Sequence, residues 1–278
     1  MKQLFDDVSR KTSKMVTRTY STSFSLGIFC LDKKFHQPIY GIYGFVRLAD
    51  EIVDSFHQYP KAELFYDFKQ QTYAAIQQGI SLNPVLNSFQ EVVNHYHIDH
   101  ELIESFLKSM EADLTQNVHN ENSIKEYILG SAEVVGLMCL RVFTEGDNQK
   151  YQQLKYAAMR LGAAFQKINF LRDLKDDFKD LGRTYFPDIN LAQFSDHDKR
   201  RIEAEIEEDF NEALKGIRKL PKGSMFGVYV AYAYYRALFA KIRSLPSDRV
   251  LMERIRIPNN LKIGLLLQSY VKYRFNAI

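Results

Sequence analysis

Two pairs of aspartates occur at the same spacing in distant parts of the chain. Asp50 and Asp54 lie four residues apart, and so do Asp173 and Asp177. On a helix, a spacing of four advances about 6 Å and overshoots one turn by about 40°, so both carboxylates of a pair leave the same face. Like charges stacked in this way repel each other, which predicts a cationic partner for each pair.

Arginines accompany both pairs. Arg47 precedes Asp50 by one turn, Arg172 directly precedes Asp173, and Arg183 follows the second pair. Carboxylates without histidine or cysteine ligands suit a hard cation, Mg²⁺ or Mn²⁺, which keeps some waters and is completed by substrate phosphate oxygens. Arginine forks would neutralise the remaining phosphate charge. The pattern predicts that both pairs face one cavity and bind a phosphorylated ligand through metal ions.

Three other interpretations compete with this one. A di-iron helix bundle needs Glu-x-x-His pairs on facing helices, and none of the seven histidines forms such a pair near the aspartates. Acid and base catalysis by two carboxylates, as in glycoside hydrolysis, is a second alternative. A single aspartate pair would usually be solvated helix surface, but two pairs of the same design favour a functional site.

Composition places the chain among ordinary globular proteins. Its 278 residues are 46% hydrophobic and 26% charged, and the net charge of +3 gives no case for nucleic-acid binding. The 17 Tyr and 20 Phe without any Trp suit a chain that must line a large apolar space as well as fill a core.

Cysteine usage and the chain start predict a cytoplasmic protein. Cys30 and Cys139 lie far apart without ligand spacing, so we expect free thiols in a reducing compartment. No apolar segment of a secretory signal follows Met1, and the longest apolar run, Met225 to Tyr235, is too short to span a bilayer.

Helical periodicity extends along almost the whole chain. We therefore expect one all-α domain over residues 1–278, with about ten helices around a central cavity. The expected helices cover residues 2–18, 38–56, 61–78, 84–97, 99–114, 147–178, 195–216, 225–242 and 259–275, with a further helix that starts at 123 and has 131–140 in its middle.

Several individual residues predict where helices start, what is exposed and where helices pack closely. Pro38 is expected in the first turn of its helix, and Ser123 with Glu126 is expected to form a capping box. Asp113 is expected to be a surface charge, although its place beside an apolar stripe leaves a site role open. Gly136 inside a helix predicts close approach of another helix or of a ligand.

The two acidic segments resemble the motifs of the squalene and phytoene synthase family, the head-to-head prenyl synthases. They are YGFVRLADEIVD and QKINFLRDLKDDFKDLGRTYFP, and TYSTSFSL, EYILGSAEVVG and SMEADL resemble further landmarks. The resemblance covers nearly the whole chain and is closest to a bacterial phytoene synthase. It implies the all-α isoprenoid synthase fold, Mg²⁺ as cofactor, and two allylic diphosphates bound together.

The resemblance also implies roles for individual residues. The metal ligands would be Asp50, Asp54, Asp173 and Asp177. The residues that meet diphosphate oxygens would be Arg47, Arg172 and Arg183. The diphosphate end would be lined by Ser21, Ser23, Tyr43, Gln166 and Asn169. Tyr185 and Tyr235 would lie near the reacting centre, and Val135 and Gly136 would wall the prenyl tunnel. Glu51 and Glu133 depart from the family pattern, and no partner for Glu133 is evident.

The implied reaction joins two geranylgeranyl diphosphates through a cyclopropyl diphosphate to phytoene, in carotenoid biosynthesis, with NADPH not expected. Alternatives are dehydrosqualene, squalene or presqualene diphosphate synthesis from farnesyl diphosphate. Alternatives of another class are a non-catalytic assembly factor of the same family and a lipid-binding regulatory domain. Because the substrate is hydrophobic, we also expect peripheral membrane contact through the apolar C-terminal helix.

Overall fold

The computed structural model describes residues 1–115, 118–179, 184–187, 189, 193–275 and 278, except for the side chains of 176–179 and 259. Across these residues the structure is helical and contains no strand, with one isolated bridge between Val118 and Thr184. The predicted all-α fold is therefore confirmed. The helices are α1 (Lys2–Tyr20), α2 (Thr22–Phe29), α3 (Lys33–Ser55), α4 (Lys61–Gln78), α5 (Pro84–Tyr96), α6 (His100–Ala112), α7 (Glu121–Ile128), η1 (Leu129–Glu133), α8 (Val134–Phe143), α9 (Asn148–Lys179), α10 (Asp196–Ile217), α11 (Lys222–Arg243), α12 (Ser247–Val250) and α13 (Asn259–Arg274).

Several helix ends follow from local chemistry. Gly79 ends α4 with a φ of 70°, the left-handed conformation that glycine adopts without strain. The Asn83 side chain caps α5 by accepting from the backbone N–H of Val85, and Ser195 caps α10 by accepting from Asp198. These helix ends lie where the sequence analysis predicted them.

Two specific predictions about helix starts are wrong, and α11 begins at Lys222 rather than at the predicted Met225. Pro38 lies inside α3, which begins at Lys33, and the Phe35 N–H already donates to the Asp32 carbonyl at 2.9 Å. The capping box of α7 is formed by Asn120 and Ser123, not by Ser123 and Glu126. Asparagine caps as well as serine does, so the helix starts at the earlier cap.

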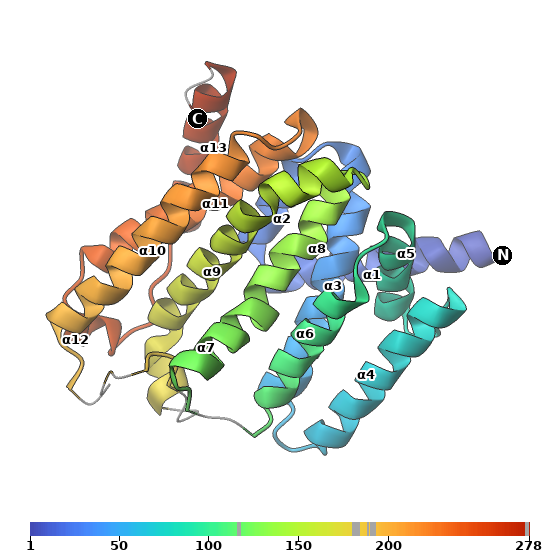
Figure 1. Ribbon diagram of the computed structural model, residues 1–278, viewed down its shortest axis with the longest axis horizontal. Helices are drawn as coiled ribbons and strands as arrows, with labels where there is room; N and C mark the ends of the chain where they lie inside the picture. The colour runs from blue at the N-terminus through green and yellow to red at the C-terminus, as the bar shows by residue number, and fades with distance from the viewer. Residues whose placement is uncertain (116–117, 180–183, 188, 190–192, 276–277) are drawn as a thin grey trace.

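Two large apolar cores are built from the helices shown in Figure 1. Residues of both cores line the cavity described below. The first core packs α3 to α6 against α8 around Phe45, whose ring stacks on Phe89 with centroids 3.9 Å apart. The second core packs α9 to α11 around Phe210 and Phe239. Because α3 belongs to the first core and α9 to the second, the two acidic helices can face the space between them.

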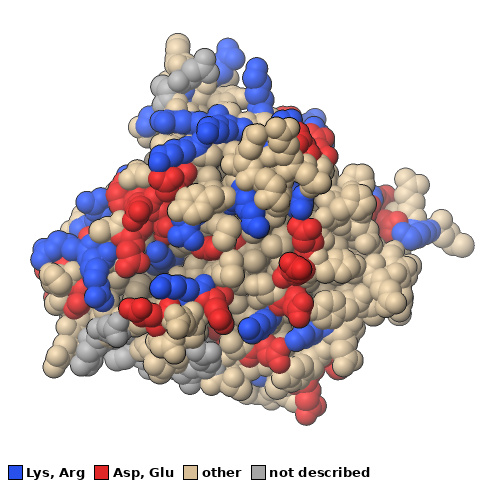
Figure 2. All heavy atoms as spheres, in the orientation of Figure 1, with Lys and Arg blue, Asp and Glu red and all other residues tan. Residues whose placement is uncertain are grey.

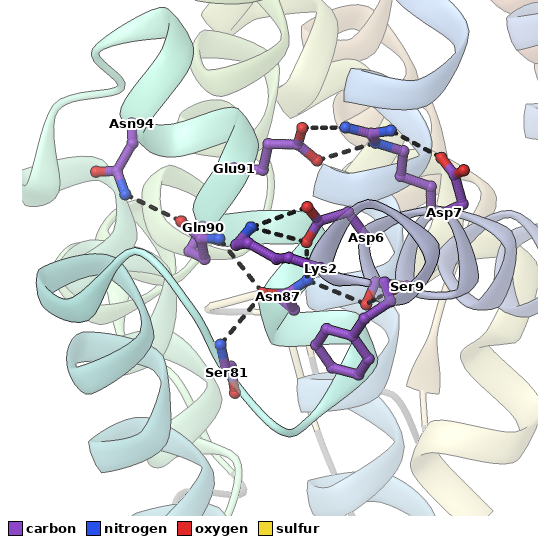
Figure 3. A network of polar contacts seen from close by, with 11 residues as sticks. Lys2, Asp6, Asp7, Ser9, Ser81, Asn87, Gln90, Glu91 and Asn94 are labelled. Carbon is purple, nitrogen blue, oxygen red and sulfur yellow. Dashed lines mark hydrogen bonds and ion pairs between the residues drawn. The ribbon is translucent and has the colours of Figure 1, made fainter.

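Helix α1 is attached to the first core by polar contacts (Figure 3). The Asn87 amide of α5 donates to Asp6 and to the hydroxyl of Ser9, each at 3.1 Å. Arg10 Nε donates to Glu91 at 3.0 Å. Small hydroxyl side chains on the buried face of α1 allow this close approach, so α1 is fixed against α3 and α5.

The helix from Glu121 to Phe143 contains one wide turn. Residues Leu129–Glu133 form the π-helical turn η1 between α7 and α8. A Cβ placed on Gly162 of α9 would lie 2.7 Å from the Ala132 carbonyl oxygen, and one on Gly136 would lie 3.0 Å from that of Ala158. Close packing of α9 therefore explains the glycine inside this helix, as predicted for Gly136.

Candidate active site

A cavity of about 620 Å³ runs between the two cores. Helices α2, α3 and α6 to α11 supply its walls, together with the turn η1. Most of the predicted site residues line it: Ser21, Ser23, Tyr43, Arg47, Asp50, Asp54, Val135, Gly136, Gln166, Asn169, Arg172, Asp173, Tyr185 and Tyr235. The side chain of Asp177 and the whole of Arg183 lie outside the described residues.

In the first acidic motif, an arginine pairs with two carboxylates of the same motif. Arg47 is hydrogen-bonded to Asp50 one turn later and to Glu51 beside it, while its guanidinium carbon lies 4.4 Å from the centre of the Tyr20 ring. Arg47 Nε is buried and has no protein hydrogen-bond partner among the described residues. A buried donor in a cavity wall is a position where a ligand oxygen or a water can bind.

The second acidic motif holds Asp173 between two arginines. Arg172 Nε donates to Asp173 Oδ1 at 3.0 Å, and Arg254 Nε lies 2.8 Å from the same oxygen. Burial alone would lower the pKa of Arg172, but the hydrogen bond and charge of Asp173 outweigh burial and raise it. The arginine therefore stays charged beside the cavity. A cationic partner, as predicted, is present for Asp173.

Arg254 was not predicted from the sequence. It lies between α12 and α13, in a segment without helical periodicity, and it lines the same cavity as Asp173. No sequence motif includes Arg254, because its partner Asp173 lies 81 residues earlier in the chain.

Hydroxyl and amide groups line the wall beside these charges. Ser21 caps α2 by accepting from the Phe24 N–H at 3.2 Å, so the cap interpretation of this serine is confirmed while the residue also lines the cavity. The Tyr235 hydroxyl donates to Asn169 at 3.2 Å. Burial raises the pKa of Tyr235 to about 12, which keeps this phenol a hydrogen-bond donor at neutral pH.

Asp113 is buried, so the prediction of a surface charge is wrong. The Tyr127 hydroxyl donates to its Oδ2 at 3.0 Å, and Tyr127 lines the cavity. Burial, followed by the charge of Asp113, raises the pKa of Tyr127 well above its ordinary value. Asp113 lies at the end of α6, whose apolar stripe packs in the interior. The sequence pattern of this one helix could not show that Asp113 is buried.

The rest of the cavity wall is apolar. It includes Ile28, Leu31, Ile39, Phe106, Met110, Leu140, Phe143 and Ile217. Cys139 also lines this part, and burial raises its pKa to about 12. Both cysteines are free thiols, as predicted. The cavity thus joins a charged end to a long apolar space, which suits a ligand with an anionic head and a hydrocarbon tail.

The donor set at the charged end fits Mg²⁺ by its chemistry. Asp50, Asp54 and Asp173 offer carboxylate oxygens only, and Mg²⁺ is usually held by one or two carboxylates plus waters and phosphate oxygens. Among the side chains that the structure describes, no group of three His, Cys, Asp or Glu residues is close enough to hold an ion by itself. The aspartates are instead balanced in part by arginines.

Comparison with known proteins agrees with this arrangement. A family model described as squalene/phytoene synthase matches residues 17–260. Phytoene synthase of Arthrospira platensis is 24% identical over 291 residues, which cover 96% of this chain and 94% of that protein. Phytoene synthase 1 of Solanum lycopersicum is 25% identical over 82% of this chain, which spans 60% of the plant protein's length.

A crystal structure of a dehydrosqualene synthase in complex with a ligand has the same fold. It superposes with a TM-score of 0.82 at 18% identity and covers 97% of this chain and 98% of the other. The family model covers most of the chain, including both acidic motifs. This chain belongs to the squalene/phytoene synthase family.

Proposed function

We propose that the protein is an Mg²⁺-dependent prenyltransferase that condenses two geranylgeranyl diphosphates head to head to phytoene. One observation carries the proposal: a single cavity joins three aspartates and three arginines at one end to a long apolar wall. That combination matches a diphosphate head and a prenyl tail. The retained aspartates favour an enzyme over a non-catalytic assembly factor of the same family.

The proposed reaction balances without a reductant. In the first half, the C–O bond of the donor breaks with its electron pair leaving on diphosphate, and the acceptor double bond attacks the allylic cation. Loss of one proton closes a cyclopropane. In the second half, the remaining C–O bond breaks, the ring opens with rearrangement, and loss of a second proton gives the triene. Two prenyl diphosphates thus yield one hydrocarbon and two diphosphates, so NADPH is not required.

The charged end would hold the leaving groups. Asp50, Asp54, Asp173 and Asp177 would hold Mg²⁺, which when bound neutralises diphosphate and stabilises it as a leaving group. Arg47, Arg172 and Arg183 would donate to diphosphate oxygens, and Arg254 is placed to join them from its position against Asp173. The buried Nε of Arg47 is the donor that such an oxygen would satisfy.

The neutral residues would orient the substrates and exclude water. Ser21, Ser23, Tyr43, Gln166 and Asn169 would bind at the diphosphate end. Tyr235, stacked on Phe165 with centroids 3.8 Å apart, and Tyr185 would shield the cation from water. Val135 and Gly136 would wall the prenyl chain. The protein would work in the cytoplasm.

Product analysis tests the proposal. The purified protein is incubated with farnesyl or geranylgeranyl diphosphate, with Mg²⁺ or with EDTA, and with or without NADPH, and the hydrocarbons are identified by mass spectrometry. We expect phytoene from geranylgeranyl diphosphate with Mg²⁺ alone. A C30 triene from farnesyl diphosphate would move the assignment to dehydrosqualene synthesis, and squalene formed only with NADPH would move it to the reductive branch. No metal-dependent product from either substrate would reject an enzymatic function.

A further inference from the structure

A second hollow lies between helices α10, α11 and α13, outside the active site. It is a groove of about 410 Å³, and none of its described lining residues lines the active-site cavity. Tyr229 and Tyr232 of α11 face the groove. Ala231 and Tyr235, on the opposite face of the same helix, line the active-site cavity. Helix α11 therefore separates two spaces, and the groove falls within the size range of small-molecule sites, roughly 300–1,000 Å³.

The groove is lined by charges of one sign. Its described lining residues include Arg218, Arg236 and Lys272 but no aspartate or glutamate. Arg236 donates to Glu207 at 2.7 Å, whereas no ion pair joins Arg218 or Lys272 to a carboxylate within the described part of the chain. Figure 1 shows α13 projecting beyond the other helices, and Figure 2 shows Lys and Arg atoms on this projecting part. Two cations at the groove are therefore available to an anion.

The remaining wall of the groove is apolar and aromatic. Tyr229 and Tyr232 are buried, with ring centroids 5.9 Å apart, and Leu265 of α13 packs on the second core. Ile278 also lines the groove: its side chain packs against the second core, and its carbonyl oxygen accepts from Arg218 Nε at 2.9 Å. The groove thus already holds a branched aliphatic group whose neighbouring oxygen is bound by Arg218. None of the described helices, α13 included, has both the length and the hydropathy of a membrane span.

We propose that this groove is a second binding site, for a small molecule with an oxyanion head and a short branched aliphatic body. Arg218 and Lys272 would bind the oxyanion by charge-assisted hydrogen bonds, and the tyrosine rings with Leu265 would bury the aliphatic body. The ligand would take the place of Ile278 at Arg218, so Ile278 acts as a built-in competitor. Phosphate and carboxylate heads share this chemistry, and the test separates them. The site does not depend on the proposed function.

Isothermal titration calorimetry with the whole chain, in EDTA and without Mg²⁺, tests the proposal. The probes 3-methylbutyl phosphate and 3-methylbutanoate carry both parts of the ligand, whereas inorganic phosphate carries only the head and 3-methylbutanol only the body. We expect saturable binding of at least one of the two complete probes below about 10 mM, and binding of each partial probe at least about tenfold weaker. The tighter complete probe identifies the head. No saturation by either complete probe would overturn the proposal.

Matched variants separate the groove from the basic surface around it. Arg218→Gln with Lys272→Gln should weaken binding of the tighter probe about tenfold or more. The control, Lys219→Gln with Arg274→Gln, removes the same charge from exposed positions outside the groove and should change binding by less than about twofold. Ile278→Ala should strengthen binding by several-fold, because it weakens the competitor. Equal effects of the two double variants would overturn the proposal, and weaker binding by Ile278→Ala would overturn the competitor assignment.

Hydrogen exchange of the wild type locates the bound probe without any substitution. Amides of α10, α11 and α13 should exchange more slowly with saturating probe, and those of α1 and α4 should not change. A cavity variant, Arg172→Gln with Arg254→Gln, should bind the probe as the wild type does, because neither residue lines the groove. Loss of binding in this variant, with protection of α9 instead, would place the probe in the active-site cavity and overturn the proposal.

Discussion

The Arg160 guanidinium on α9 is hydrogen-bonded to the buried carboxylate of Glu133, the last residue of the turn η1. The same guanidinium donates to Asp209 of α10 at 3.1 Å, and Lys167 Nζ lies 2.9 Å from the other Asp209 oxygen. One cation thus joins η1, α9 and α10 behind the cavity wall. If η1 relaxed to an ordinary helix of the same length, α7 would turn by about 100° relative to α8 and would carry Tyr127 away from Asp113.

Removing Arg160 should lower the free energy of unfolding far more than removing an exposed arginine does. Its side chain is 27% exposed and that of Glu133 only 7%, so Arg160→Met leaves a buried carboxylate uncompensated and should cost about 3–5 kcal/mol. Arg243 pairs with Glu207 but is 53% exposed, and Arg243→Met should cost less than about 1 kcal/mol. Urea unfolding of both variants measures the difference. Equal costs would show that the Glu133 pair contributes no more than a surface pair.

The stability contribution of Glu133 should depend on pH. Burial, which outweighs the attraction of Arg160, raises the pKa of Glu133 above its ordinary 4.5, so the folded protein holds this proton to a higher pH than the unfolded chain does. Its contribution is full below the unfolded pKa and is lost as the pH rises through the folded pKa. Relative to wild type, Glu133→Gln should therefore gain stability as the pH rises from about 4 to about 7.

Glu111→Gln provides a control of opposite sign. The hydrogen bond from Lys69 lowers the pKa of Glu111, so the wild-type carboxylate stabilises the fold above the unfolded pKa and loses this contribution as the pH falls through the folded pKa. Relative to wild type, the urea midpoint of Glu111→Gln should fall as the pH rises over the same range. A Glu133→Gln difference that stays constant with pH would contradict the assigned shift.

Alanine at Gly162 should destabilise the molecule, whereas alanine at Gly264 should not. A Cβ at Gly162 would meet the backbone of Ala132 at 2.7 Å and the Cα of Glu133 at 3.0 Å, so α9 and η1 must separate, at about 1–3 kcal/mol. Gly264 on α13 has no atom within 4 Å of such a Cβ, and alanine there should stabilise by roughly 0.5–1 kcal/mol. Thermal melts of the two variants check both signs, and a neutral Gly162→Ala would contradict the close approach.

Asp173→Asn should impair both the proposed activity and, slightly, the fold. Asparagine loses the ionic partner of Arg172 and Arg254, which should cost about 1–3 kcal/mol without metal. Hydrocarbon formation should fall by about 10²-fold or more, because leaving-group stabilisation is the main catalytic contribution. Product assays over a range of Mg²⁺ concentrations measure the effect, with the exposed Asp67→Asn as control. Full activity of Asp173→Asn would remove this residue from the proposed site.

Local pattern was enough to predict most of the helices and the two acidic motifs, but not the short helices α2 and α12. Helix geometry placed Asp50 and Asp54 on one face, and the like design of the second motif, together with the family resemblance, led to the prediction that Asp173 shares their site. The positions of Asp113 and Arg254 depend on how distant helices pack, which no short segment determines. The start of α3 was likewise missed, because the helix begins five residues before Pro38. Glu133 looked anomalous in an apolar stretch because its partner Arg160 is on another helix.

The turn η1 makes the helix from α7 to α8 tolerant of a change in length. A π-helical turn accommodates one residue more than an α-helix of the same number of turns, so Tyr127 and Val135, eight positions apart, complete about two turns and both line the cavity. Seven positions of ordinary α-helix also complete about two turns. Deleting a single codon between Leu129 and Glu133 would therefore leave both side chains on the cavity wall.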